Sequence, residues 1–123
     1  MLREIFIVGI VLLILDSGWI TIIKDPFLNM ISKIQKQKIN IKFLPLVLCY
    51  IILILAHYYF IIYRKACLLD SFMLGFFIYA TYELTSLTLF NNWNPYIAIA
   101  DTLWGGFLFL LTYIIYIYIN KYV

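Results

Sequence analysis

Four long apolar stretches limit what this chain can fold into more than any other feature. They cover residues 5–23, 43–63, 71–90 and 96–118. A helix that crosses the hydrocarbon core of a bilayer needs about 20 apolar residues, with a range near 17–25. Backbone groups in lipid must be hydrogen-bonded within the protein, and the alternating pattern of a membrane barrel is absent. The sequence therefore predicts an all-α integral membrane four-helix bundle, as a single transmembrane domain over residues 1–123.

The composition excludes the main classes of water-soluble protein. Hydrophobic residues make up 66% of the chain and charged residues 12%, with a mean hydropathy of +1.01. Soluble domains are about 25% charged, so a soluble enzyme, a nucleic-acid-binding module and a disordered chain are excluded. The basic residues behind the net charge of +3 are too few and too scattered for a nucleic-acid footprint. They are better interpreted as anchors at the membrane surface, and the expected partner is the lipid bilayer.

All three links between the spans are informative. Pro45 and Pro95 fall at predicted helix starts, where a missing backbone N–H is tolerated. The short polar link over residues 91–95 predicts that the third and fourth helices are antiparallel neighbours, and the link over residues 64–70 is equally short.

The link over residues 24–42 is longer and rich in lysine. Within it Phe27, Met30, Ile31 and Ile34 recur at i, i+3, i+4 and i+7, which places them on one face of a helix. Asp25 and Pro26 before them form a plausible helix start. We therefore expect a short amphipathic helix that lies on the membrane surface between the first two spans. An ordinary solvated basic loop is the alternative.

Four spans place both termini on the same side of the membrane. The basic residues do not decide which side this is, because they divide almost evenly between the two faces. The face of the termini carries Arg3, Arg64, Lys65 and Lys121, and the other carries Lys24, Lys33, Lys36, Lys38 and Lys42. The denser second group favours a cytoplasmic link over residues 24–42 with both termini outside.

Three acidic residues lie within the predicted spans: Asp16, Glu83 and Asp101. An acidic group at such a position costs roughly 2.5–3.5 kcal/mol on insertion, so it normally faces the bundle interior and marks a functional site. At ~1.5 Å per helical residue, all three lie about 8–11 Å below the face that carries residues 24–42 and 91–95. His57 lies near the opposite face, about 21 Å away from that surface.

The neighbours of these acids share their helix faces. A polar intramembrane site is therefore predicted from Asp16, Trp19, Tyr79, Tyr82, Glu83, Ser86, Asp101 and Trp104, with Gly105 permitting close packing. Asp16 and Asp101 are each followed by a tryptophan three residues later. Like charges at one depth cannot all ionise in a low dielectric, so at least one carboxyl is expected to hold a proton near neutral pH. The alternative is that these groups merely cross-link the helices by hydrogen bonds.

No other motif carries recognisable chemistry. Cys49 and Cys67 have neither metal-site nor disulfide-framework spacing, and His57 is the single histidine. The sequence contains no glycine-rich phosphate loop, no Ser/His/Asp set and no paired histidines. Neither a metal nor a cofactor is expected.

The stretch GFFIYATYELTSLTLFNNWNPYIAIADTLWG, residues 75–105, resembles a family of small bacterial and viral membrane proteins, domain-of-unknown-function family 2177. Members of this family look like "YATYDLTNLATLKNW" followed by "VDxxWG", with "DxxW" in the first helix. The matching residues are Asp16, Trp19, Tyr79, Ala80, Thr81, Tyr82, Leu84, Thr85, Trp93, Asp101, Trp104 and Gly105. Glu83 stands where aspartate is usual, and Ser86 where asparagine is usual. The resemblance implies a four-helix membrane protein and assigns no activity.

Three functions from different classes fit this pattern. The first is proton-linked transport or permeation of a small solute, which predicts an oligomer because one short bundle can barely enclose a path. The second is a membrane-embedded lipid-modifying enzyme with two carboxylates as acid and base, since their depth lies just beneath the headgroups. The third is a non-catalytic scaffold or accessory subunit. Whether the chain is an enzyme stays open at this point.

Overall fold

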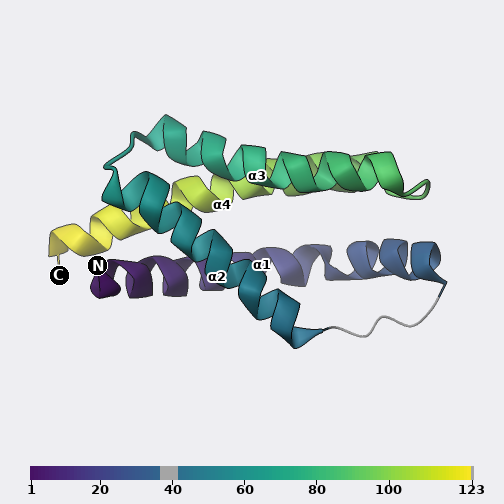
Figure 1. Cartoon of the computed structure of the whole chain (residues 1–123), viewed down its shortest axis with the longest axis horizontal. Helices are drawn as coiled ribbons and strands as arrows, with labels where there is room; N and C mark the ends of the chain where they lie inside the picture. The colour runs from purple at the N-terminus through teal and green to yellow at the C-terminus, as the bar shows by residue number, and fades with distance from the viewer. Residues whose placement is uncertain (37–41, 123) are drawn as a thin grey trace.

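A computed structural model of the protein describes residues 1–36 and 42–122, and this part of the chain is built from long helices (Figure 1). They are α1 (Leu2–Gln35), α2 (Phe43–His57) with its π-helical continuation η1 (Tyr58–Tyr63), α3 (Leu68–Leu89) and α4 (Pro95–Tyr122). The two segments α2 and η1 together form one candidate span, so the described residues contain four spans that are long and apolar enough to cross a membrane. The predicted all-α membrane bundle is confirmed.

The helices are arranged so that α3 and α4 lie side by side, α1 lies along α4, and α2 crosses α1 obliquely (Figure 1). Both chain ends lie at one end of the bundle, where Arg3 Nη1 donates a 2.8 Å hydrogen bond to Asn120 Oδ1. We call this the terminal end. At the other end, here called the turn end, the backbone N–H of Asn94 contacts Met30 Sδ at 3.0 Å.

Glycines allow the closest approach between α3 and α4. A Cβ atom added at Gly75 would lie 2.1 Å from the carbonyl oxygen of Gly105. A Cβ atom added at Gly105 would lie 2.2 Å from the ring of Tyr79. Since real Cβ atoms do not approach other atoms this closely, only glycine permits the observed packing at both positions.

The outer surface of the bundle is strongly apolar. Leu44 and Ile22, for example, are 71% and 75% exposed in the isolated chain. Contiguous apolar surface of this kind is unfavourable in water and is what a bilayer covers. The outward faces of all four helices therefore fit a lipid environment.

The separate amphipathic helix predicted after the first span is wrong. Residues 24–35 are helical, but they continue α1 without a break, and Pro26 lies inside the helix rather than at a start. The apolar stripe does not face the membrane surface either, because Phe27, Met30 and Ile31 belong to a cluster packed around Trp93. A proline removes one backbone hydrogen bond, and this packing against the turn between α3 and α4 stabilises the helix despite that loss. Residues 37–41 of the predicted link, which include Lys38, lie outside the described residues.

Candidate functional site

The two Asp-x-x-Trp motifs bind each other across the contact between α1 and α4. Trp19 Nε1 on α1 donates a hydrogen bond of 3.1 Å to Asp101 Oδ1 on α4. Trp104 Nε1 on α4 donates one of 3.0 Å to Asp16 Oδ1 on α1. Because α1 and α4 run in opposite directions (Figure 1), each tryptophan reaches the aspartate of the other motif. We call this reciprocal pair of hydrogen bonds the Asp–Trp exchange.

The two indoles of the Asp–Trp exchange also stack on each other. The ring centroids of Trp19 and Trp104 lie 5.4 Å apart, and the ring planes differ by 12°. Stacked aromatic pairs contribute about 0.5–1.5 kcal/mol beyond the burial of their area. An indole N–H can only donate, so the aspartate oxygens are the acceptors in both hydrogen bonds. The stack therefore fixes the position of two donors and the two carboxyl groups that they serve.

Tyr50 on α2 completes the surroundings of Asp16. Its hydroxyl donates to Asp16 Oδ2, so both carboxyl oxygens of this buried aspartate accept hydrogen bonds. The sequence analysis missed Tyr50. The helical-rise argument applied to His57 could have found it, because Tyr50 lies half as far along α2 from Phe43 as His57 does.

Glu83 on α3 lies beside Asp101 and is almost fully buried. Trp93 Nε1, from the turn between α3 and α4, donates a 2.7 Å hydrogen bond to Glu83 Oε2. The other oxygen, Oε1, is buried and has no hydrogen-bond partner within residues 1–36 and 42–122. Such an orphan acceptor is rare in proteins and requires an explanation. Trp93 was not among the predicted site residues, although the family pattern contains it.

The remaining predicted residues of α3 do not all point to the carboxyl groups. Tyr79 packs its ring against Gly105 and against the apolar cluster that contains Leu12 and Phe109. Ser86 is buried, whereas Tyr82 is 50% exposed and touches Trp93 edge-on, with ring centroids 6.2 Å apart. The stripe expected to face inward as a unit is therefore divided between the bundle interior and its surface.

His57 lies apart from the carboxyl groups, in the half of the bundle nearer the terminal end. Its Nε2 is 3.0 Å from the carbonyl oxygen of Phe109, which also accepts a 2.8 Å hydrogen bond from Ser71 Oγ. Because a carbonyl only accepts, Nε2 carries the proton in this hydrogen bond. His57 is fully buried, and its Nδ1 has no hydrogen-bond partner in the described parts of the chain. This arrangement joins α2, α3 and α4 through one carbonyl group.

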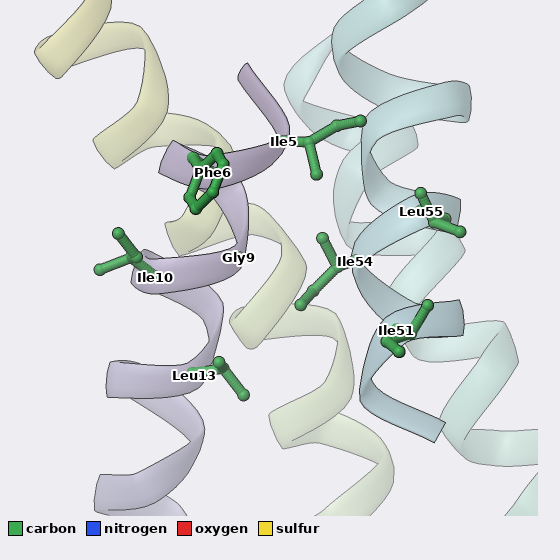
Figure 2. Close-up of a pocket in the computed structure, with 8 residues that line it drawn as sticks. All are labelled: Ile5, Phe6, Gly9, Ile10, Leu13, Ile51, Ile54 and Leu55. Carbon is green, nitrogen blue, oxygen red and sulfur yellow. The ribbon is translucent and has the colours of Figure 1, made fainter. Parts of the chain in front are cut away.

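A hollow between α1 and α2 does not lead to the carboxyl groups. It has a volume of about 320 Å³, and only apolar residues line it, among them Gly9, Leu13 and Ile54 (Figure 2). Figure 2 shows Ile54 pointing from α2 toward Gly9 on α1, where an added Cβ would meet the Ile54 side chain at 3.4 Å. This hollow therefore offers no hydrogen-bonding side chain to a polar solute.

The remaining metal-ligating residue types are dispersed. Cys49 and Cys67 are free and exposed. Among the residues that the structure describes, no three His, Cys, Asp or Glu side chains are grouped so that they could hold a metal ion. The site is therefore described by its carboxyl groups and by the aromatic groups that donate to them.

Comparison with known proteins gives one match. No curated protein and no solved structure is similar to the chain. A family described as "Predicted membrane protein (DUF2177)" matches residues 1–118, which include every residue of the site. The chain is thus a member of this family of predicted membrane proteins.

Proposed function

We propose that this membrane protein performs proton-linked transport or permeation of a small solute, with Glu83 and Asp101 as the pair that binds the proton. The observation that carries this proposal is the buried Glu83 Oε1, which has no donor in the described residues and lies on a carboxyl group placed beside that of Asp101. One proton held between the two carboxyl groups would supply the missing donor.

The distribution of donors supports a single shared proton. Asp16 accepts hydrogen bonds from Trp104 and Tyr50, so each of its two carboxyl oxygens already has a donor. Glu83 and Asp101 each accept one hydrogen bond from an indole, and no further donor in the described structure serves them. Two adjacent carboxyl groups in a low dielectric cannot both be charged. The pair then holds one negative charge and one proton, which is the resting state of a proton carrier.

Proton uptake would act on the contact between α1 and α4. Hydrogen bonds to a charged acceptor are roughly twice as strong as those between neutral groups. A second proton on the pair would neutralise Asp101 and weaken the hydrogen bond that it accepts from Trp19. The Asp–Trp exchange would loosen on the Asp101 side, while Asp16 kept both of its donors. Proton binding would therefore weaken the contact between α1 and α4 at Asp101 and leave it intact at Asp16.

We further propose that the transporting form is a homo-oligomer with both termini on one side of the membrane. The hollow of about 320 Å³ between α1 and α2 is not lined by any of the three intramembrane carboxyl groups, and neither is another of about 470 Å³ between η1 and α3. Additional walls would come from neighbouring copies. A scaffold or accessory subunit is the second candidate, and the enclosure of the carboxyl groups by stacked indoles favours it.

Proton flux into proteoliposomes tests the proposal. Vesicles contain a pH-sensitive dye, with or without a low-molecular-weight cell extract as a source of solute, and a potassium gradient with valinomycin drives the flux. We expect flux with the wild type and with Asp25→Asn, a control that removes an exposed carboxyl group, and none with Glu83→Gln or Asp101→Asn. Wild-type flux no greater than that of empty vesicles under both conditions would contradict transport and favour the scaffold. Altered lipids in the same vesicles would indicate the lipid-modifying enzyme.

A further inference from the structure

A second hollow lies at the terminal end, between η1 and α3, and has a volume of about 470 Å³. Its lining includes two charged residues, Arg64 and Asp70, and apolar side chains such as Met73 and Phe77. Asp70 lies in the first turn of α3, and Phe77 lies two turns further along the helix. The hollow is therefore charged near the end of the bundle and apolar deeper along α3, which is the polarity of a membrane lipid.

The two charges in this hollow do not neutralise each other. The single ion pair within the described parts of the chain joins the N-terminal amine to Glu4, so Arg64 and Asp70 are not paired. Arg64 instead holds its guanidinium 5.3 Å from the ring centroid of Tyr59. Both side chains are exposed in the isolated protein. One cation and one anion thus border the same hollow, and neither has an ion-pair partner in the described parts of the chain.

The link that carries Arg64 is held in place by hydrogen bonds to its backbone carbonyl and N–H groups. The N–H of Ala66 donates to the carbonyl oxygen of Ile61 at 3.0 Å, and Tyr113 Oη donates to the carbonyl oxygen of Ala66 at 2.6 Å. Lys65, which follows Arg64 directly, adopts a left-handed backbone conformation with φ 53°. A binding group on a fixed link loses less conformational entropy when a ligand binds. The backbone that carries Arg64 is accordingly fixed before a ligand binds.

We propose that this hollow binds a phospholipid whose headgroup carries both a phosphate and a primary amine, as in phosphatidylethanolamine. The phosphate binds Arg64, because a guanidinium donates two parallel hydrogen bonds to a phosphate. The ammonium group binds Asp70, and an acyl chain lies along Met73 and Phe77. The site is remote from the carboxyl groups of the proposed proton site, so this inference does not rest on the transport proposal.

The chemistry of the two charges predicts selectivity among headgroups. A choline headgroup has the same charges, but its quaternary ammonium cannot donate a hydrogen bond to Asp70. A glycerol headgroup has no positive charge. The negative charges of Asp70 and of the phosphate would then repel each other, with no ammonium group between them to offset the repulsion. Lys65 is a further cation on the link but does not line the hollow, so it attracts anionic lipids without distinguishing their headgroups.

Native mass spectrometry of the purified full-length protein tests the proposal. The protein receives phosphatidylethanolamine, phosphatidylcholine or phosphatidylglycerol with identical acyl chains, and the fraction with bound lipid is compared. We expect phosphatidylethanolamine to bind at least about fivefold better than the other two, a difference of about 1 kcal/mol. Equal binding of the three lipids would overturn the proposal, and so would preferred binding of phosphatidylglycerol.

Three variants locate the binding. Arg64→Gln should reduce binding of phosphatidylethanolamine several-fold, and Asp70→Asn should abolish its advantage over phosphatidylcholine. Lys65→Gln is the matched control, which removes a neighbouring cation that does not line the hollow and should keep the preference. Thermal melting of each variant shows whether it is folded. A folded Asp70→Asn that still prefers phosphatidylethanolamine would contradict the assignment of the ammonium group to Asp70.

Discussion

Trp19 and Trp104 stack with their ring centroids 5.4 Å apart, and each indole donates its N–H to the aspartate that belongs to the other's motif. On both α1 and α4, therefore, the tryptophan of the Asp-x-x-Trp motif is the donor and the aspartate is the acceptor. The arrangement joins the two hydrogen bonds physically, because a shift of either ring alters the stack as well as its own hydrogen bond. We expect the four residues to behave as one unit.

Replacement of either indole by phenylalanine should show this coupling. Trp104→Phe keeps an aromatic ring but removes the N–H, so Asp16 loses one of its two donors at a cost of about 1–3 kcal/mol in unfolding free energy. Trp19→Phe removes the donor to Asp101 with a similar effect. The double variant should lose clearly less than the sum, since residues in one network couple by about 0.5–3 kcal/mol.

Denaturant unfolding in detergent micelles measures these free energies. Tyr96→Phe serves as the control, because Tyr96 is 81% exposed and should change stability by no more than about 0.5 kcal/mol. Strict additivity of the two tryptophan substitutions would show that the two hydrogen bonds act independently.

Asp101 should tolerate replacement by asparagine for folding but not for proton-dependent activity. The amide carbonyl can accept from Trp19, and the NH2 group can donate to Glu83 Oε1, which otherwise lacks a donor in the described structure. Asp101→Leu should destabilise the protein by roughly 1–3 kcal/mol more, because it leaves the Trp19 N–H and Glu83 Oε1 unpaired. Melting temperatures and proton flux of the two variants check both parts. Equal melting temperatures would show that Asp101 has no hydrogen-bonding role.

The sequence predicted the spans better than their contacts. Apolar length and helical rise indicate the four helices and the relative depth of Asp16, Glu83 and Asp101, and the same arithmetic extends to Tyr50. The Asp–Trp exchange could not be predicted, because it depends on how α1 and α4 are rotated against each other, and spacing along one helix does not contain that angle. The uninterrupted α1 depends likewise on packing of Met30 and Phe27 around Trp93, whereas Pro26 alone favours a helix start.

The topology predicts that residues 36 and 92 lie on one side of the membrane and residue 120 on the other. Single cysteines at Lys36, Asn92 and Asn120, introduced after replacement of the exposed Cys49 and Cys67 by alanine, should react accordingly with a membrane-impermeant maleimide in sealed vesicles. The physical reason is that Met30 contacts Asn94 at the turn end, while Arg3 binds Asn120 at the terminal end. Opposite labelling of positions 36 and 92 would contradict the bundle.

Glycine-to-alanine substitutions should destabilise the protein at the tight contact between α3 and α4 but not on the exposed surface of α1. Gly75→Ala would place its Cβ 2.1 Å from a backbone carbonyl oxygen, and neither helix can yield without parting from the other. We expect a loss of roughly 1–3 kcal/mol or more in unfolding free energy, as for other overpacked positions. In Gly105→Ala the added Cβ would lie 2.2 Å from the Tyr79 ring. The resulting separation of the two helices should also disturb Glu83 beside Asp101.

Gly18→Ala is the matched control, because nothing lies within 4 Å of its added Cβ, and alanine stabilises an exposed helix position by up to about 1 kcal/mol. Denaturant unfolding of the three variants should rank Gly18→Ala at or above the wild type and the other two well below it. Equal stability of Gly75→Ala and Gly18→Ala would contradict the close packing of α3 on α4.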